Sequence, residues 1–253
     1  MRGMTLTVRF SAVGKRRDGG WLLAIAVSLV SLALGASAAE AQLLVSRYTV
    51  HMEGVRVGHA IVRTTLGPAD YKVTVSADVG PVLSNTRING EATGLRNGSH
   101  VTPMRFRFVS SGGEASSVNF AGPDGTPASV NPRLRGVFDP LSAIVFAALN
   151  PPPPSDEPCK SLIPIILARA RFDIVMSPKP GGADPRSEII DCDAYSTVST
   201  PGASGGIGAQ NARWQIGFSK VSRPALWLVE YLVVPTSNGT MTISREETNI
   251  SAS

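Results

Sequence analysis

The sequence predicts a mainly β protein, built as a strongly curved antiparallel sheet or open barrel with one buried apolar helix. Apolar side chains alternate with polar ones along several short runs, which is typical of strands that bury one face. Turn-forming dipeptides such as Asn89-Gly90 and Asn238-Gly239 separate these runs, so we expect consecutive strands to pair antiparallel. One apolar run without alternation interrupts the pattern and indicates a helix.

Residues 1–41 are expected to form a cleaved secretory signal peptide, which leaves residues 42–253 as a single β-rich domain. Basic residues 15–17 precede an apolar stretch at 21–34, and Ala39-Glu40-Ala41 offers small residues before a cleavage point at Gln42. A second possible cleavage site follows Ala38. The alternative is a membrane anchor, but the apolar stretch of about 14 residues is shorter than the roughly 18–20 that a spanning helix needs. We therefore expect a periplasmic protein without a transmembrane anchor after cleavage.

The charge balance of the mature chain is nearly neutral. The whole chain has 24 Lys and Arg against 19 Asp and Glu. Cleavage removes five basic and two acidic side chains, which leaves 19 and 17. The remaining charges alternate in sign and form no basic cluster, so no nucleic-acid partner is expected.

The strands are predicted in order along the mature chain. Alternation places them at residues 48–52, 71–79, 104–108 and 214–218, and from residue 241 onward. Residues 163–167 and 171–176 are expected to form two strands or one bent strand, and residues 187–198 another. Residues 226–234 are apolar on both faces, which predicts a central strand covered on both sides. Roughly ten to twelve strands are expected in all, with a Gly- and Ser-rich loop at 200–211.

The helix is predicted at residues 141–149. Asp139 is a good N-cap and Pro140 suits the first helical position. The run is apolar nearly all round, so the helix must be buried, and we expect it against the concave face of the sheet. The proline run 151–154 ends it and forms a stiff spacer.

Cys159 and Cys192, the two cysteines of the chain, both survive cleavage. In an oxidising compartment such a pair is most simply a disulfide. Closing a loop of about 34 residues would stabilise the fold by roughly 3–4 kcal/mol on the chain-entropy model. The alternatives are a metal pair or a redox pair, but the spacing and the lack of a nearby histidine match neither pattern.

Patterns that could carry catalysis are incomplete. Gly202-Ala203-Ser204-Gly205-Gly206 has the letters of a nucleophile elbow, but all three histidines precede it and the stretch lies in a predicted loop. His51, Glu53 and His59 could bracket a metal, but a third ligand is not evident, so they are expected to be solvated surface residues. The carboxylates of Asp78, Glu91 and Glu114 have nothing in the sequence to pair them. We therefore expect no enzyme activity, no metal and no cofactor.

A ligand cavity is the candidate site, because a curved sheet can enclose an apolar hollow that a helix closes. Its expected lining is apolar and comes from the predicted strands and helix: Phe106, Phe108, Leu141, Ile144, Val145, Phe146, Leu149, Trp214 and Trp227. The side chains of Arg63, Arg87, Arg105 and Arg107 would hold an anionic headgroup if their strand faces lined that cavity. By default they point to solvent.

The chain resembles the domain-of-unknown-function 3108 family of exported bacterial proteins over about residues 45–247. The resemblance rests on a Tyr and Gly pattern, the helix start, the cysteine pair and a closing Pro and Gly pattern: Tyr48, Gly54, Gly58, Tyr71, residues 138–143, Cys159, Cys192, Pro224, Pro235 and Gly239. The chain departs from the family at residues 167–173, where Phe-Asp-Gly-Arg is common. The resemblance implies an exported β-rich protein with no established catalytic residue.

These observations favour a non-catalytic periplasmic binding or carrier protein for an apolar or amphipathic envelope ligand, such as a lipid, or an envelope accessory factor. One alternative is a structural or interaction protein whose core is filled. A hydrolase that acts on an envelope polymer is the other.

Overall fold

The computed structural model describes residues 41–80, 86–113, 115–122, 134, 136–150, 159, 161–167, 170–179, 188–198, 213–221, 226–236 and 238–252. The predicted signal peptide up to residue 40, the proline run 151–154, the loop 200–211 and Ser204 lie outside the described residues.

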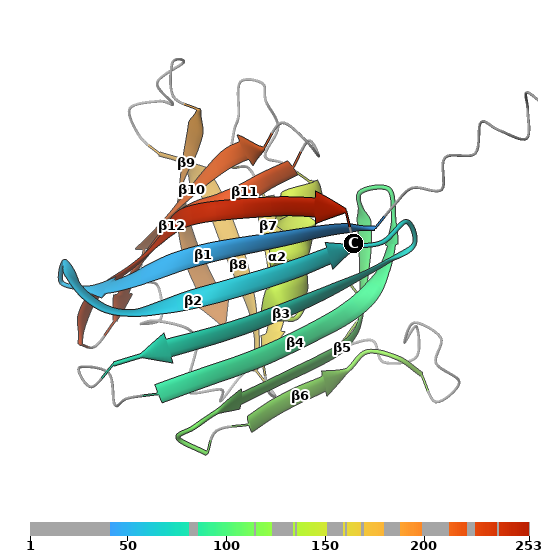
Figure 1. Cartoon of the computed structure of the whole chain (residues 1–253), viewed down its shortest axis with the longest axis horizontal. Coiled ribbons are helices and arrows are strands. Elements are labelled where there is room, and N and C mark those ends of the chain that lie inside the picture. Colours follow the sequence, from blue (N-terminus) through green and yellow to red (C-terminus); the bar gives the residue numbers. More distant parts are fainter. Residues whose placement is uncertain are drawn as a thin grey trace, which may run out of the picture. The chain divides into compact units, whose positions relative to one another are not determined.

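Twelve strands form one antiparallel sheet that curls into a nearly closed barrel, which confirms the predicted fold class (Figure 1). The first half of the sheet comprises β1 (Gln42–Met52), β2 (Val55–Leu66), β3 (Asp70–Val79), β4 (Thr86–Asn97), β5 (His100–Ser110) and β6 (Ala115–Asn119). The second half comprises β7 (Ser161–Leu167), β8 (Ala170–Pro178), β9 (Ile189–Val198), β10 (Arg213–Val221), β11 (Leu226–Thr236) and β12 (Gly239–Ala252).

Each half of the sheet is a meander in which consecutive strands pair, as the turn dipeptides predict. The two halves join through β1 and β12, so the strand order runs from β6 through β1 and β12 to β7. At the other end β6 and β7 are not paired. The chain before the helix lies beside β7, where Phe138 N donates to Pro164 O (2.9 Å) and Ile166 N donates to Phe138 O (2.8 Å).

Two strand predictions need correction or refinement. Residues 161–178 form two antiparallel strands, β7 and β8, rather than one bent strand. Strand β11 lies between β10 and β12 in the sheet, as predicted for a central strand. Along this strand buried Leu226 and Leu228 alternate with half-buried Trp227 and Val229, and none of its side chains is exposed.

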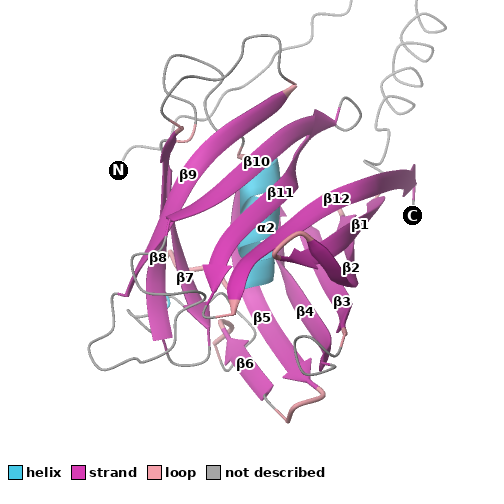
Figure 2. Ribbon diagram, turned by 90° about the vertical axis from the view of Figure 1, so that its left-hand side faces the viewer, coloured by secondary structure: helices cyan, strands magenta, loops and turns pink. Residues whose placement is uncertain are grey.

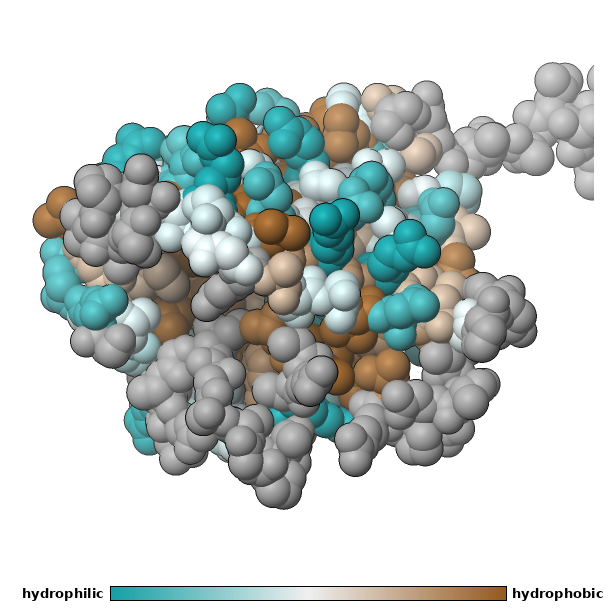
Figure 3. Space-filling view, turned by 90° about the horizontal axis from the view of Figure 1, so that it is seen from below, coloured by the Kyte–Doolittle hydropathy of each residue, from teal (hydrophilic) through white to brown (hydrophobic). Residues whose placement is uncertain are grey.

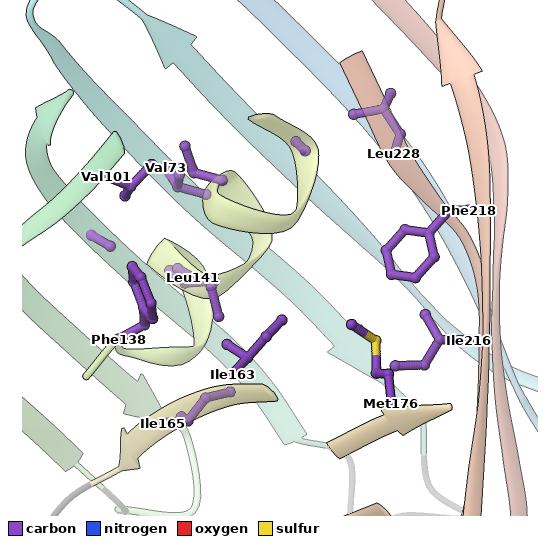
Figure 4. Close-up of a cluster of buried hydrophobic side chains, with 14 of the residues drawn as sticks. Val73, Val101, Phe138, Leu141, Ile163, Ile165, Met176, Ile216, Phe218 and Leu228 are labelled. Carbon is purple, nitrogen blue, oxygen red and sulfur yellow. The ribbon is translucent and has the colours of Figure 1, made fainter. Parts of the chain in front are cut away.

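The helix α2 (Pro140–Leu149) lies on the concave side of the sheet, where it contacts β3, β4, β5, β7 and β11 (Figures 1 and 2). Its side chains are buried or half-buried, and none is exposed. Figure 4 shows Leu141 of α2 close to Ile163 of β7, with Val73 and Val101 from the first half of the sheet and Ile216 and Phe218 from the second half around it. The core therefore joins both halves of the sheet through the helix.

Cys159 and Cys192 form a disulfide, with their Cα atoms 5.5 Å apart. Cys159 follows the helix and precedes β7, whereas Cys192 lies on β9, and both are buried. The bond ties the chain that leaves α2 across β8 to the third strand from the sheet edge. Because β7 is the last strand of the second half, this covalent tie fixes the chain that leads into that end of the sheet.

Candidate functional site

The helix packs where one strand carries small side chains on its inner face. Gly90, Ala92 and Gly94 share that face of β4, because they alternate with exposed or half-buried residues of the opposite face. A Cβ atom at Gly90 would lie 3.4 Å from Leu141 Cδ1 and 2.9 Å from Val75 Cγ1. At Gly94 it would lie 2.4 Å from the hydroxyl oxygen of Tyr71. Glycine at these positions therefore makes the room that Leu141 and Tyr71 occupy.

A buried hydrogen-bond chain, which we call the helix anchor, fixes the start of α2 to the sheet. Asp139 Oδ1 accepts from the backbone N–H groups of Leu141 (3.0 Å) and Ser142 (2.9 Å). Asp139 Oδ2 accepts from Ser142 Oγ (2.5 Å), and Ser142 Oγ in turn accepts from the Tyr71 hydroxyl (2.7 Å) on β3. The predicted N-cap is confirmed, and its carboxylate also connects the helix to a strand through two side chains.

The helix anchor is closed to solvent, which raises the pKa values of its two titratable side chains, Asp139 and Tyr71. Asp139 and Ser142 are 0% exposed and Tyr71 is 3% exposed. Burial raises the pKa of Asp139 above its usual value of 3.8, although the hydrogen bonds from Ser142 and Leu141 oppose the shift. Burial also raises the pKa of Tyr71, so its hydroxyl keeps its proton and donates to Ser142. All three polar side chains are satisfied within the anchor.

The nine predicted cavity residues belong to one hydrophobic cluster around α2. Phe106, Leu141, Val145 and Trp214 are buried in it. The other five are half-buried against it: Phe108, Ile144, Phe146, Leu149 and Trp227. Phe146 also packs on Phe138, with ring centroids 4.7 Å apart. The cluster therefore assembles the residues that the sequence analysis proposed.

Several apolar side chains on the inner wall keep exposed surface. The register aligns Val62, Val75 and Phe108 with Gly90 in one row across β2 to β5, on the face that Leu141 contacts. All three are half-buried, as are Leu232 on β11 and Ile250 on β12. A side chain that faces the inside of a nearly closed sheet and still has exposed surface adjoins space that protein atoms do not fill. Seen from below, brown side chains are visible in a recess (Figure 3).

Trp214 leaves a polar group unsatisfied in this cluster. Its side chain is buried on β10, and its indole Nε1–H has no hydrogen-bond partner in the described part of the chain. A buried donor without an acceptor costs about 1–3 kcal/mol. The site therefore offers one unused donor to any molecule that enters.

An ion pair on the other side of the interior was not predicted. Arg245 of β12 pairs with Glu230 of β11, and Ser219 of β10 contacts both. Tyr48 lies opposite Arg245 in the register, on the same face of β1 as Leu44 and Ser46. We call Arg245, Glu230, Ser219 and Tyr48 the charged cluster.

The sequence did contain a pattern that could have located the charged cluster. Met241, Ile243 and Arg245 have the same parity along the last strand, and Leu228, Glu230 and Leu232 have the same parity along the apolar run. Period-2 alternation places residues of one parity on one face. Each charged residue therefore falls on a face that is otherwise apolar.

The tyrosine of the charged cluster is buried as well. Its hydroxyl donates to the backbone oxygen of Val229 (3.2 Å). Burial raises the pKa of Tyr48, while the positive charge of Arg245 lowers it by a smaller amount. Tyr48 is therefore a hydrogen-bond donor at neutral pH, directed at the backbone of β11.

The arginines that the sequence analysis considered for a headgroup are exposed on the outer face. Arg63 and Arg107 border a groove of about 500 Å³ over β2 to β5, and Arg87 borders a second groove of about 500 Å³ that also contains His59. Arg105 is exposed on β5. Arg87 Nε donates to Asp78 (2.7 Å). The side chains of these four arginines are exposed, whereas Arg245 lies on the inner face of β12.

The other candidate groups do not converge. Glu53 accepts a hydrogen bond from Thr240 N, and His59 lies 3.9 Å from Asp78. Glu91 pairs with Lys72 (2.8 Å) on the outer face, and Glu114 lies outside the described residues. Within the described ranges, no three His, Cys, Asp or Glu side chains are grouped as metal ligands.

Comparisons with known proteins do not assign the chain. No protein-family model matches it, and no curated protein is significantly similar to it. The resemblance to the domain-of-unknown-function 3108 family stays a prediction. In the part of the chain that the structure describes, no helix has the length and hydropathy of a membrane span.

Proposed function

We propose that the mature protein is a non-catalytic periplasmic binding or carrier protein for an apolar or amphipathic envelope ligand, which it holds between α2 and the inner wall of the sheet. The observation that carries the proposal is the row of inward-facing, half-buried apolar side chains Val62, Val75 and Phe108. Their exposed surface is apolar, and covering it by a hydrocarbon chain gains about 25 cal/mol per Å².

Two further features support an amphipathic rather than a purely apolar ligand. The unpartnered indole N–H of Trp214 would be satisfied by an acceptor such as an ester carbonyl. The charged cluster supplies polar groups on the same inner wall. The disulfide is compatible with an oxidising compartment such as the periplasm.

The test is native mass spectrometry of the exported protein, followed by lipid extraction. The wild type should carry copurified lipid, and Val62→Trp should reduce it at least about fivefold, because the larger side chain occupies the space beside the row. The matched control is Arg63→Trp, which adds the same ring on the exposed face of the same strand. Val62→Leu, a smaller change, should give an intermediate result if the Trp variant does not fold.

Absence of lipid from folded wild-type protein, together with failure to take up added lipid, would contradict the proposal. Equal loss of lipid in Val62→Trp and Arg63→Trp would contradict the interior location. Either result would favour the alternative of a structural protein with a filled core.

A further inference from the structure

The charged cluster lies where two neighbouring strands separate. The ladder between β11 and β12 runs from Thr236–Gly239 to Tyr231–Ser244 and ends there in the described residues. Glu230 and Arg245 are the next residue on each strand beyond that last pair. In Figure 2, β11 and β12 diverge, and α2 is visible behind β11. The cluster therefore marks the point at which the inner wall stops being a continuous sheet.

The cluster satisfies part of its own hydrogen-bonding capacity and leaves part of it free. Arg245 Nη2 donates to Glu230 Oε2 and to Ser219 Oγ (2.5 Å), and Ser219 Oγ donates to Glu230 Oε2 (2.8 Å). Arg245 Nη1 donates to Thr248 Oγ1 (3.4 Å), and no hydrogen bond between described residues uses Arg245 Nε or Glu230 Oε1. The partly exposed pair therefore keeps one donor and one acceptor that no described residue uses.

Partial exposure separates this ion pair from an ordinary structural one. The Arg245 side chain is 13% exposed and the Glu230 side chain is 27% exposed. The pair is buried enough for solvent to screen its charges only in part, and exposed enough for a ligand to contact it. By contrast, the Arg47–Glu247 pair on the outer face of the same sheet region is about half exposed, at 54% and 51%, where ion pairs contribute little.

The charge of the cluster decides which headgroup suits it. Arginine and glutamate cancel, so a ligand that brings a net charge into this poorly solvated place leaves that charge uncompensated. A carboxylate could accept from Arg245 but would face the Glu230 carboxylate. A hydroxyl donates to Glu230 and accepts from Arg245 at once, which uses both free groups.

We infer that the charged cluster binds the uncharged, hydroxyl-bearing headgroup of an amphiphile of the monoacylglycerol type. The inference rests on the proposed function, because the acyl chain occupies the apolar interior described above. Arg245 and Glu230 make the hydrogen bonds to the headgroup, and Ser219 holds the Glu230 carboxylate in place by a hydrogen bond. The Tyr48 hydroxyl donates to the backbone oxygen of Val229, next to Glu230 on β11.

The experiment compares binding of 1-monooleoylglycerol and of oleate to the mature protein at pH 8, by native mass spectrometry with both present at equal concentration. The wild type should favour monooleoylglycerol by about tenfold or more. Glu230→Gln removes the negative charge and leaves Arg245 uncompensated, so the preference should shift toward oleate by about tenfold. Glu247→Gln removes a carboxylate from the outer pair on β12 and should leave the preference unchanged.

The outcomes separate this inference from the proposed function. A wild type that binds both amphiphiles equally, or prefers oleate, overturns the inference while leaving an interior lipid site. The same holds if Glu230→Gln and Glu247→Gln shift the preference alike. If the wild type binds neither amphiphile, the proposed function itself fails.

A second variant covers the case in which Glu230→Gln does not fold. The uncharged double variant Glu230→Gln with Arg245→Gln should keep the preference for monooleoylglycerol, and a preference for oleate would overturn the inference.

Discussion

The interior contains two polar networks, and they differ in what surrounds them. The helix anchor of Asp139, Ser142 and Tyr71 is fully enclosed, and its hydrogen bonds are made within the network. The ion pair of the charged cluster (Arg245, Glu230, Ser219 and Tyr48) is partly exposed, and no described residue bonds to Arg245 Nε or Glu230 Oε1. An enclosed and satisfied network positions structural elements, whereas a shielded but incomplete one is suited to bind a ligand.

This comparison has a physical basis in solvent access. A buried polar group that lacks a partner costs about 1–3 kcal/mol. In a network that is buried without a ligand, the polar groups therefore bond to one another. The charged cluster avoids part of that cost because the Arg245 and Glu230 side chains stay 13% and 27% exposed. A ligand would replace that solvent, which requires no rearrangement of the pair.

The disulfide gives the largest expected effect and tests the structural side of the comparison. Replacing Cys159 and Cys192 together by Ala should lower the free energy of unfolding by roughly 3–4 kcal/mol, because the unfolded chain regains the entropy of an open loop. Urea unfolding of both proteins measures the difference. The preference between the two amphiphiles should not change, and a change would show that the bond also shapes the charged cluster.

Breaking the helix anchor should cost nearly as much. Asp139→Ala removes the acceptor for two backbone N–H groups and for Ser142 Oγ, and we expect a loss of about 2–4 kcal/mol. Asp139→Asn keeps one acceptor oxygen and should lose less than half of that. Thermal and urea unfolding compare the two variants. Equal losses would mean that the carboxylate connection to Ser142 adds nothing to the cap.

The pH dependence of stability distinguishes Asp139→Asn from the wild type. Burial raises the pKa of Asp139, so the folded state holds that proton more tightly than the unfolded state does. The contribution to stability is therefore full below the ordinary pKa of 3.8 and falls as the pH rises through the raised pKa. Relative to the wild type, Asp139→Asn should gain stability as the pH increases across this window. A difference that is flat with pH would contradict the shift.

Removing the charged cluster should have the smallest effect on stability. Replacing Arg245 by Met and Glu230 by Leu together exchanges a partly buried pair for apolar groups, and the free energy of unfolding should stay within about 1 kcal/mol of the wild type. Binding of monooleoylglycerol should nevertheless fall by about tenfold or more. A loss of stability comparable to that of Asp139→Ala would place the cluster with the structural networks and remove the contrast.

The local elements of this protein could be predicted because each depends on neighbouring residues. The alternation at 71–79 predicts β3, and Asp139-Pro140 before an apolar run predicts the start of α2. The nine residues proposed to line a cavity share one hydrophobic cluster for a similar reason, since large apolar side chains on the buried face of a strand or helix must meet in a core. The Cys159–Cys192 bond followed from there being only two cysteines.

Other features depend on pairings between distant residues, which alternation does not encode. The register of Tyr48 with Arg245 joins positions about 200 residues apart, and the Tyr71–Ser142 hydrogen bond joins a strand to a helix. The sequence therefore determined that Arg245 and Glu230 each fall on an apolar face. Only the tertiary structure decided that they meet, because β1 closes on β12 and β11 separates from β12 at that residue. The face of the sheet to which a side chain points is set by the alternation along its own strand. The residue that it contacts is set by how the two halves of the sheet come together.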